Sequence, residues 1–307
     1  MAGTLTISIE IELGWGVHDL NETTHLSKNG DKEREYLQKL LQKTEEYNIP
    51  ITFDIVGHLL LSDCAGTHDG PYQKGWFDSD PGTGISDAPL FYAPDMATSV
   101  LSTETNHELC THTFSHLLCG NASDELVDKE LERAQKLHAE FDNRVSSFVP
   151  PRHQQPKNET LSRNGIQAAR YAKADESLSK IHRFKELTIG PHPKWEPKIQ
   201  DGILETYCTM YPSLTARSLP AGRRSSNLIF KPFPIELRKR AHLYYLRRTT
   251  WQAIESEVPL HLWTHLYDLS NRHQWDVLAD YFDFLSTIPD EDLQVKTMES
   301  LADERHE

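Results

Sequence analysis

Segments that alternate apolar and polar residues are repeatedly followed by segments with helical periodicity, and this order constrains the fold more than any other feature. The first example is the run TLTISIEIE at residues 4–12, a predicted strand, which precedes a predicted helix at 31–47. Repeated strand–helix units favour a mostly parallel sheet or barrel with functional residues at the carboxyl ends of the strands. We predict further strands at 50–56, 108–111, 146–149, 203–207, 258–266 and 293–298, and helices at 93–103, 123–141, 161–169, 235–254 and 275–285.

The charge balance is acidic and argues against nucleic acid as a partner. The 307 residues include 46 Asp and Glu against 32 Lys and Arg, which gives a formal net charge of −14. The densest basic stretch, at 238–248, has the amphipathic spacing of a solvated helix face. Since no basic stripe is available to neutralise phosphates, we expect no nucleic-acid partner.

The chain has no internal repeat and no clear interdomain linker, so we predict a single domain over residues 1–307. Residues 63–91 are rich in Gly, Asp and Pro and lack periodicity. Loops of this length in compact domains are usually functional or disordered. We therefore expect a long loop insertion at about 63–91.

Cysteine usage and the N-terminus indicate a cytoplasmic protein. The four cysteines form no C-x-x-C pair, so we expect neither a structural zinc knot nor a thioredoxin-type motif. Nothing demands disulfides, which fits a reducing compartment. Residues 1–12 lack the pattern of a signal peptide, and the apolar stretch 51–61 contains Asp54 and His58. We therefore expect no stable membrane anchor.

The segment HTFSH holds two histidines, His112 and His116, four residues apart. Two histidines at this spacing can meet one metal ion if the segment is helical. The alternative is a surface pair or a satisfied core pair. With 16 histidines in the chain, one such pair is expected by chance, and His261 and His265 have the same spacing.

Glu10 and Glu12 lie two residues apart on the first predicted strand, so their side chains share one face. One carboxylate can bind a metal while the other acts as a base. The alternative is the polar face of an edge strand. A sheet buried on both sides, however, would not leave two glutamates unpaired.

Two further strand ends carry candidate residues. Arg152 follows Pro150 and Pro151 at the end of the strand 146–149, where it can hold a carboxylate or be an ordinary surface arginine. His265 is nearest the end of the strand 258–266, where a barrel enzyme places a general acid. The alternative for His265 is a buried ring bonded to a carbonyl.

In their order along the chain, these motifs resemble the polysaccharide deacetylase family, the NodB homology group of carbohydrate esterase family 4. HTFSH is the most specific of them, and the resemblance spans nearly the whole chain. The matching stretches are SIEIELGWG (8–16), TFDIVGHLL (52–60), WFDSDPG (76–82), YAPDM (92–96), HELCTHTFSH (107–116), FVPPRHQ (148–154) and LHLWTHLYDL (260–269).

The resemblance implies an α/β fold, a distorted (β/α)7 barrel, and a role for each candidate. It implies a divalent metal, zinc first, with cobalt, manganese, nickel or iron as alternatives. The family's first motif has two adjacent aspartates and its arginine motif has a later proline, whereas here Ile11 separates the glutamates and Gln154 stands in place of the proline. By resemblance the metal ligands are Glu12, His112 and His116, the base is Glu10, the residue orienting it is Arg152, and the general acid is His265.

The expected activity is hydrolysis of an N-acetyl or N-formyl group on an amino sugar or glycan precursor, with a carbohydrate as the partner. Trp15, Trp76 and Trp263 can stack on sugar rings, with core packing as the alternative for each. The competing function is a non-catalytic metal- or carbohydrate-binding protein on a decayed deacetylase barrel, which the altered first and third motifs would explain.

Overall fold

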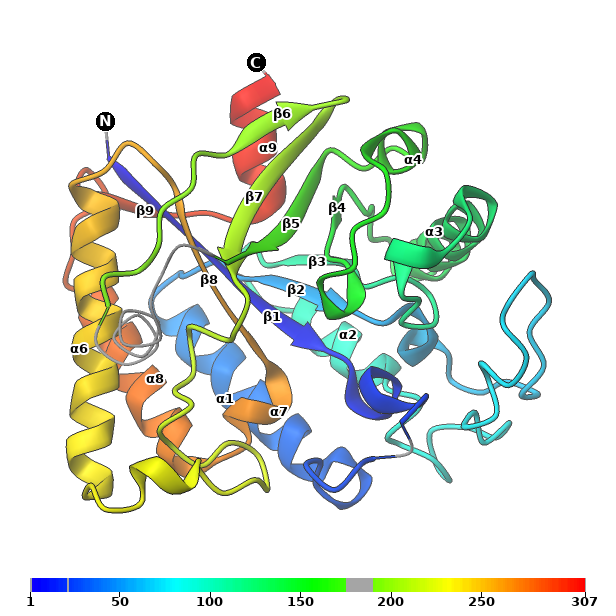
Figure 1. The fold of residues 1–307 in the computed structure, drawn as a ribbon, viewed down its shortest axis with the longest axis horizontal. Coiled ribbons are helices and arrows are strands. Elements are labelled where there is room, and N and C mark those ends of the chain that lie inside the picture. The colour runs from blue at the N-terminus through cyan, green and yellow to red at the C-terminus, as the bar shows by residue number, and fades with distance from the viewer. Residues whose placement is uncertain (1, 21, 175–189, 307) are drawn as a thin grey trace.

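A computed structural model of the chain describes residues 2–20, 22–174 and 190–306 (Figure 1). Its centre is a nine-stranded sheet in the order β6-β7-β5-β4-β3-β2-β1-β8, with β9 paired to β1. The strands are β1 (Gly3–Ile11), β2 (Thr52–Ile55), β3 (Glu108–Thr111), β4 (Ser147–Phe148), β5 (Ala168–Lys173), β6 (Lys198–Gln200), β7 (Ile203–Thr209), β8 (Leu260–His265) and β9 (Leu293–Val295).

The sheet curls into an incomplete barrel. Among the described residues, β1 to β5, β7 and β8 run parallel to their neighbours, and β6 pairs antiparallel with β7. Side chains rather than a strand ladder bring β7 and β8 together: the Trp263 indole donates to the Thr209 carbonyl (2.7 Å), and Thr206 Oγ1 lies 3.3 Å from His261 Nδ1. The predicted distorted α/β barrel is therefore confirmed.

Helices cover the outside of the barrel (Figure 1). The longest, α6, contacts β1 and α8, while α9 contacts β5 and β7. None of the described helices is both long and apolar enough to cross a membrane. The helices are α1 (Asp31–Glu46), α2 (Pro94–Leu101), α3 (Asp124–Ala139), α4 (Asn158–Arg163), α6 (Ile235–Ile254), α7 (Leu266–Leu269), α8 (Arg272–Leu285) and α9 (Met298–His306).

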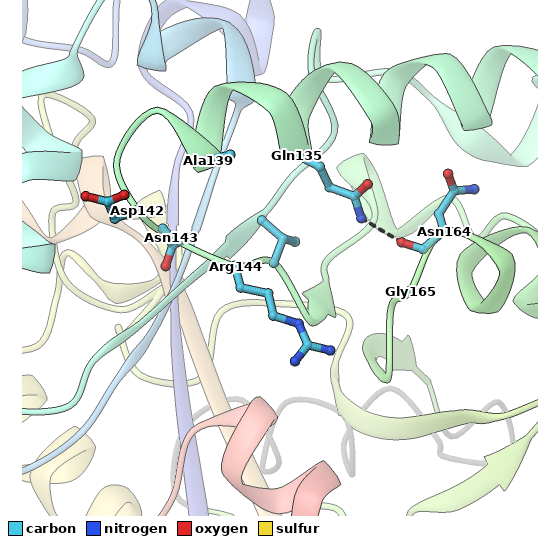
Figure 2. Close-up of a pocket in the computed structure, with 8 residues that line it drawn as sticks. Gln135, Ala139, Asp142, Asn143, Arg144, Asn164 and Gly165 are labelled. Atoms are coloured by element: carbon cyan, nitrogen blue, oxygen red, sulfur yellow. Dashed lines mark hydrogen bonds between the residues drawn. The ribbon is translucent and has the colours of Figure 1, made fainter.

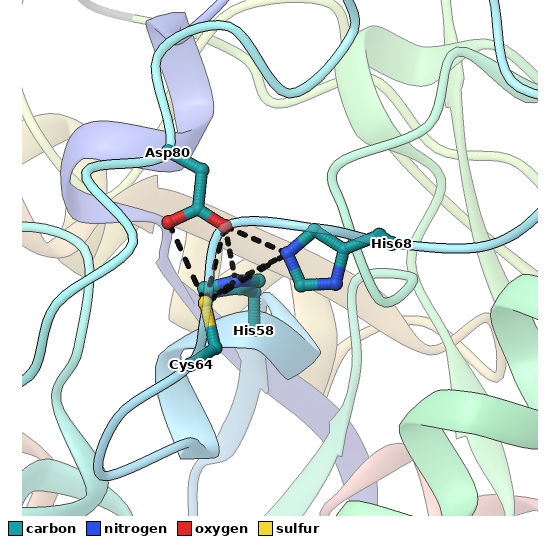
Figure 3. Close-up of side chains that lie close together, drawn as sticks. All are labelled: His58, Cys64, His68 and Asp80. Atoms are coloured by element: carbon teal, nitrogen blue, oxygen red, sulfur yellow. Dashed lines mark hydrogen bonds and ion pairs between the residues drawn. The ribbon is translucent and has the colours of Figure 1, made fainter.

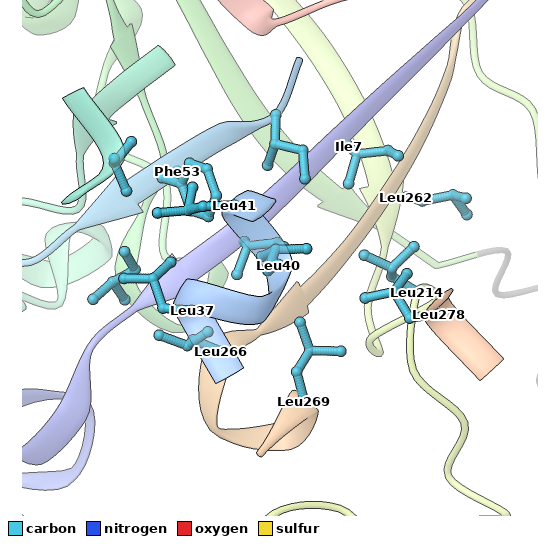
Figure 4. Packing of buried hydrophobic residues seen from close by; sticks show 14 of the residues in the cluster. Ile7, Leu37, Leu40, Leu41, Phe53, Leu214, Leu262, Leu266, Leu269 and Leu278 are labelled. Carbon is cyan, nitrogen blue, oxygen red and sulfur yellow. The ribbon is translucent and has the colours of Figure 1, made fainter. Parts of the chain in front are cut away.

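Both faces of β1 are buried, but they face different surroundings. Its apolar residues pack with leucines of α1, α7 and α8 in the core shown in Figure 4. The opposite face, with Ser8 and Glu10, points into a polar barrel interior, where Ser8 Oγ accepts from Arg170 (2.7 Å) and lies 2.9 Å from His261 Nε2. The alternation of residues 4–12 thus separates the hydrophobic core from the polar interior rather than from solvent.

Two predicted elements differ from the structure in type or bounds. The predicted helix 161–169 is a short helix, α4, that ends at Arg163, and it is followed by the strand β5 from Ala168. Its alanines and arginine favour a helix, but pairing with β4 and β7 makes this segment a strand. The predicted strand 293–298 stops at Val295, and Met298 starts α9. Residues 61–93 form no helix or strand, apart from an isolated bridge between Asp63 and Gly84.

Candidate functional site

The strand register brings acidic residues and histidines together at one end of the barrel. Glu10 of β1 lies opposite Asp54 of β2 on one side and His265 of β8 on the other. Glu12 comes just after β1, and His112 follows β3 directly. All five residues therefore gather at the carboxyl edge of the parallel sheet, where barrel enzymes place their functional residues.

The three predicted metal ligands converge. Glu12 Oε1 lies 3.2 Å from Nε2 of His112 and 3.1 Å from Nε2 of His116. All three side chains are buried, and their donor atoms lie within 4.8 Å of one another. Burial opposes the charge of Glu12, but His265 and the two histidine hydrogen bonds hold its pKa well below the ordinary value. Two imidazole nitrogens and a carboxylate oxygen form a donor set that suits zinc and leaves positions open.

The two histidines are not on a helix, although a spacing of four residues brings two histidines to one metal ion when the segment is helical. Residues 112–116 form an irregular turn in which Thr113 and His116 have left-handed backbone angles (φ 61° and 60°). The Ser115 amide and hydroxyl both donate to the Glu130 carboxylate, at 2.8 Å each. The Leu117 amide donates to Thr113 Oγ1 (2.9 Å). This hydrogen-bonded turn directs both rings toward Glu12.

Asp54 supports His112 from behind and does not appear among the predicted site residues. Its Oδ1 lies 3.2 Å from Nδ1 of His112, and its side chain is fully buried. A carboxylate at Nδ1 favours a proton there, so Nε2, which faces Glu12, is the nitrogen that would bind a metal on losing its own proton, the usual support for a metal-binding histidine. Burial opposes protonation of His112, but Asp54 and Glu12 raise its pKa to about 10 in the metal-free protein. The residues present therefore fit a divalent cation.

Glu10 is held by two cationic partners. The buried guanidinium of Arg170 forms an ion pair with Glu10 Oε1, and His265 Nε2 lies 3.1 Å from Glu10 Oε2. Arg170 also stacks on the Trp263 ring, 4.7 Å from its centroid. Burial disfavours the charge of Glu10, but Arg170 and His265 outweigh that effect and lower its pKa to about 2. Glu10 is thus a fixed carboxylate at neutral pH.

Arg152 does not make the contact that the family resemblance implies. Its guanidinium pairs with Asp19 and donates to the Gly16 carbonyl (3.3 Å), at the rim of the cleft. Arg170 of β5 occupies the place beside Glu10 instead. Arg152 lies in a left-handed turn after Pro151 (φ 47°), and its side chain reaches Asp19.

His265 is placed between two carboxylates. Its Nε2 faces Glu10, its Nδ1 lies 3.3 Å from Asp268 Oδ2, and its ring stacks on Tyr267 with 4.6 Å between centroids. Burial opposes its charge, but Glu10 and Glu12 raise the pKa of His265 well above its ordinary value. His265 therefore carries a proton that it can donate.

A small cleft of about 190 Å³ opens onto these groups. A larger hollow of about 470 Å³ lies at the end of α3, but Gln135, Arg144 and Asn164 line it without any histidine or cysteine (Figure 2). The candidate residues Glu10, Glu12 and His265 therefore line the smaller cavity. Its lining is Glu10, Glu12, Gly16, Val17, Arg152, His153, Arg224, Trp263, His265 and Tyr267.

The three candidate tryptophans have different surroundings. Trp15 is fully buried, and its indole donates to the Phe91 carbonyl (3.1 Å), so it is a core residue and cannot stack on a sugar. Trp76 is half-buried outside the cleft and donates to Ser115 Oγ (2.8 Å). Trp263 lines the cleft while also closing the barrel.

Comparison with known proteins confirms the family resemblance. Residues 28–170 match the family described as polysaccharide deacetylase. The match to this family supports a hydrolase that acts in carbohydrate deacetylation. The matched range includes Asp54, His112, His116 and Arg170, whereas Glu10 and His265 lie outside it. No curated protein matches the chain.

Solved structures share the fold at low identity. One described as a "putative polysaccharide deacetylase" from Mycobacterium smegmatis has a TM-score of 0.62 at 12% identity and covers 98% of this chain and 89% of its own. A probable polysaccharide deacetylase from Pseudomonas aeruginosa PAO1 has a TM-score of 0.58 at 12% identity, with 99% and 90% covered. A structure described as Puue allantoinase has a TM-score of 0.58 at 11% identity, with the same coverage. Such identities show the fold alone.

Proposed function

Since residues 28–170 belong to the polysaccharide deacetylase family, we propose that this chain hydrolyses the N-acetyl or N-formyl group of an amino sugar or glycan precursor. The observation that carries the proposal is the contact between Glu10 and His265 beside the group Glu12, His112 and His116, all at one barrel end. A fixed carboxylate and a protonated imidazole are the two groups that amide hydrolysis needs for proton transfer.

The group Glu12, His112 and His116, called the barrel site below, would hold a divalent cation, with zinc the first choice. When bound, the cation would polarise the acyl carbonyl and lower the pKa of a water molecule. Asp54 keeps His112 in the orientation that binding requires.

Glu10 is the proposed general base. As water attacks the acyl carbon, Glu10 takes its proton and the hydroxyl becomes part of the released carboxylic acid. Arg170 keeps Glu10 ionised and fixes its orientation through the buried ion pair. Glu10 is therefore ionised at neutral pH, the form that can accept a proton.

His265 is the proposed general acid. The carbon–nitrogen bond breaks as His265 delivers its proton to the departing amine, which leaves a free amino sugar and acetate or formate. Asp268 orients the ring through Nδ1, so Nε2 faces the cleft. A cleft of about 190 Å³ suits a single N-acyl group, with the rest of the substrate outside.

The test is release of acetate or formate from a panel of N-acylated amino sugars with added zinc, cobalt or manganese. Allantoin is the comparison substrate, because one structure of similar fold is described as an allantoinase. We expect turnover of at least one sugar and loss of turnover in Glu10→Gln. Metal binding without turnover of any substrate would favour the non-catalytic binder, and turnover of allantoin alone would overturn the sugar assignment.

A further inference from the structure

A second cluster of metal-binding side chains lies outside the barrel site. His58 is in the 3₁₀ turn Gly57–Leu60 after β2, and Cys64, His68 and Asp80 are in the long loop that follows. Figure 3 shows the four side chains pointing toward one another. Their ligand atoms, two nitrogens, a sulfur and an oxygen, all lie within 4.8 Å of one another.

The distances between these atoms are close to the edges of a tetrahedron around zinc, with the three contacts of Asp80 shorter than those edges. Bonds of about 2.0–2.1 Å to nitrogen and about 2.3 Å to sulfur place neighbouring donors roughly 3.3–3.7 Å apart. The nitrogens of His58 and His68 are 3.2 Å apart, and Cys64 Sγ is 3.6 Å from the first and 3.9 Å from the second. Asp80 Oδ2 lies 3.1, 2.7 and 3.2 Å from the His58, His68 and Cys64 atoms.

We propose that His58, Cys64, His68 and Asp80 bind a structural zinc ion, and we call this group the loop site. Four protein donors close the coordination sphere, which is typical of structural zinc, whereas the barrel site offers three. The two sites share no residue.

Without a cation, the Nε2 lone pair of His58 faces the Asp80 carboxylate at the loop site. His58 Nδ1 lies 3.4 Å from the Phe91 carbonyl, an acceptor, so the proton of a neutral His58 belongs on Nδ1 and its Nε2 presents a lone pair to Asp80. The side chains of His58, His68 and Asp80 are at most 1% exposed. Buried acceptors in contact are costly, and a cation removes that cost.

Neighbouring groups orient the donors as they do around known metal ligands. The Gly66 amide donates to Cys64 Sγ (3.3 Å) and stabilises a thiolate. The Gly82 amide (3.1 Å) and the Tyr92 hydroxyl (2.9 Å) donate to Asp80 Oδ1, which leaves Oδ2 facing the two histidines.

One neighbour opposes metal binding. Arg133 NH2 lies 2.7 Å from His68 Nδ1, and a guanidinium can only donate. A neutral His68 that binds zinc through Nε2 carries its proton on Nδ1, so this hydrogen bond must break. The affinity of the loop site is therefore set partly by Arg133.

The loop site lies behind the turn that carries the barrel ligands. Phe114, in the middle of HTFSH, packs against the His58 and His68 rings at 5.4 and 5.6 Å between centroids. The Trp76 indole ties the same loop to Ser115 (2.8 Å). A zinc ion here would fasten the loop, which lacks helix and strand, against the turn from which His112 and His116 project.

Cobalt substitution separates the two sites in the intact chain. A thiolate bound to Co²⁺ gives a sulfur-to-cobalt charge-transfer band, and only the loop site contains sulfur. We expect two zinc equivalents by metal analysis and this band in the cobalt protein. Absence of the band in fully loaded wild-type protein would overturn the proposal, whatever the enzymatic activity.

Matched variants show which residues bind each of the two zinc ions. Cys64→Ala should lose one zinc and the band, whereas Cys119→Ala, a buried thiol outside the loop, should keep both. His112→Ala should lose one zinc and keep the band. His68→Gln, a second ligand change, should also lose the loop equivalent. Retention of two equivalents by folded Cys64→Ala and His68→Gln would refute the loop site, while an unchanged metal content in His112→Ala would refute only the barrel site.

Discussion

The barrel site and the loop site use similar donors in opposite structural settings. Glu12 and His112 directly follow paired strands, and His116 lies in a hydrogen-bonded turn, so the barrel ligands are held in place without a metal. The loop ligands come mostly from residues 61–93, where the structure has neither helix nor strand. A metal ion at the barrel site would therefore contribute to the reaction. A metal ion at the loop site would instead stabilise the fold of the loop, because no helix or strand holds that segment.

The neighbours of the two sites differ in the same way. The barrel site has Glu10 and His265 beside it and opens onto a cleft. The loop site is surrounded by aromatic rings, among them Trp15, Phe77 and Phe114. The first arrangement leaves room for a substrate, and the second excludes one.

Glu10→Gln tests the chemical role of the barrel site and carries the largest expected effect. Loss of the base should lower turnover about 10²–10⁴-fold, while both metal equivalents stay bound. Steady-state kinetics and metal analysis on the same preparation measure this. Glu12→Gln is the matched change two residues away, and it should lose one metal equivalent together with turnover. Near-wild-type turnover in Glu10→Gln would remove Glu10 as the base.

Arg170→Gln tests whether the barrel region is held by its own ion pairs. Removing one partner of a buried pair leaves Glu10 uncompensated and should lower the free energy of unfolding by about 3–5 kcal/mol. Denaturant titration of the metal-free protein measures the change. Arg152→Gln, which breaks the exposed pair with Asp19, should cost at most about 1 kcal/mol. Equal losses in the two variants would contradict the assignment of Arg170.

The same pair predicts a pH dependence. The pKa of Glu10 is lowered from 4.5 to about 2, so its stabilising contribution is complete above pH 4.5 and is lost as the pH falls toward 2. The stability difference between wild type and Arg170→Gln should therefore narrow over this window in the metal-free protein. A difference that stays constant with pH would show that Arg170 acts through packing instead.

The sequence identified the residues that gather at the barrel site better than it identified the residues that support them. The alternation around Glu10 and Glu12 and the motif HTFSH are local patterns, and parallel register brings them together. Arg170 was missed because 161–169 has the composition of a helix, whereas pairing with β4 and β7 makes the segment around Arg170 a strand. In the sequence, Asp54 stands out only as a charged residue that interrupts the apolar stretch 51–61, which does not indicate a contact with His112.

The loop site was missed for a different reason. The absence of a C-x-x-C pair argued against a zinc knot, but that rule concerns cysteines close in sequence. Here the ligands are mixed, and Asp80 lies 16 residues beyond Cys64. Only the folded path of the loop, including the bridge between Asp63 and Gly84, brings them together.

Metal removal should affect the two regions differently. Chelation should increase amide exchange in residues 61–93, while β1, with its ladders to β2 and β8, keeps its protection. Zinc at about 100 times its dissociation constant would stabilise the folded loop by about 2.7 kcal/mol. Hydrogen exchange with mass spectrometry measures this, with Cys64→Ala as the control in which the loop should not respond to chelator. An equal increase in amide exchange in the loop and in β1 would contradict the proposed difference between the two sites.

Arg133→Gln should have the smallest effect of these changes, and it should strengthen zinc binding rather than weaken it. The glutamine amide oxygen can accept a hydrogen bond from His68 Nδ1, where the arginine can only donate, so the change removes the contact that opposes metal binding. We expect zinc affinity at the loop site to rise by up to about tenfold, within the range that groups behind metal ligands contribute. Competition with a chromophoric chelator measures the affinity, and the sulfur-to-cobalt band identifies the site. Arg133→Lys keeps a donor and the charge over the Phe114 ring, so it should leave the affinity nearly unchanged. Weaker zinc binding in Arg133→Gln would mean that Arg133 holds His68 in place for the metal. That result would contradict the inference that the Arg133 contact opposes metal binding at the loop site.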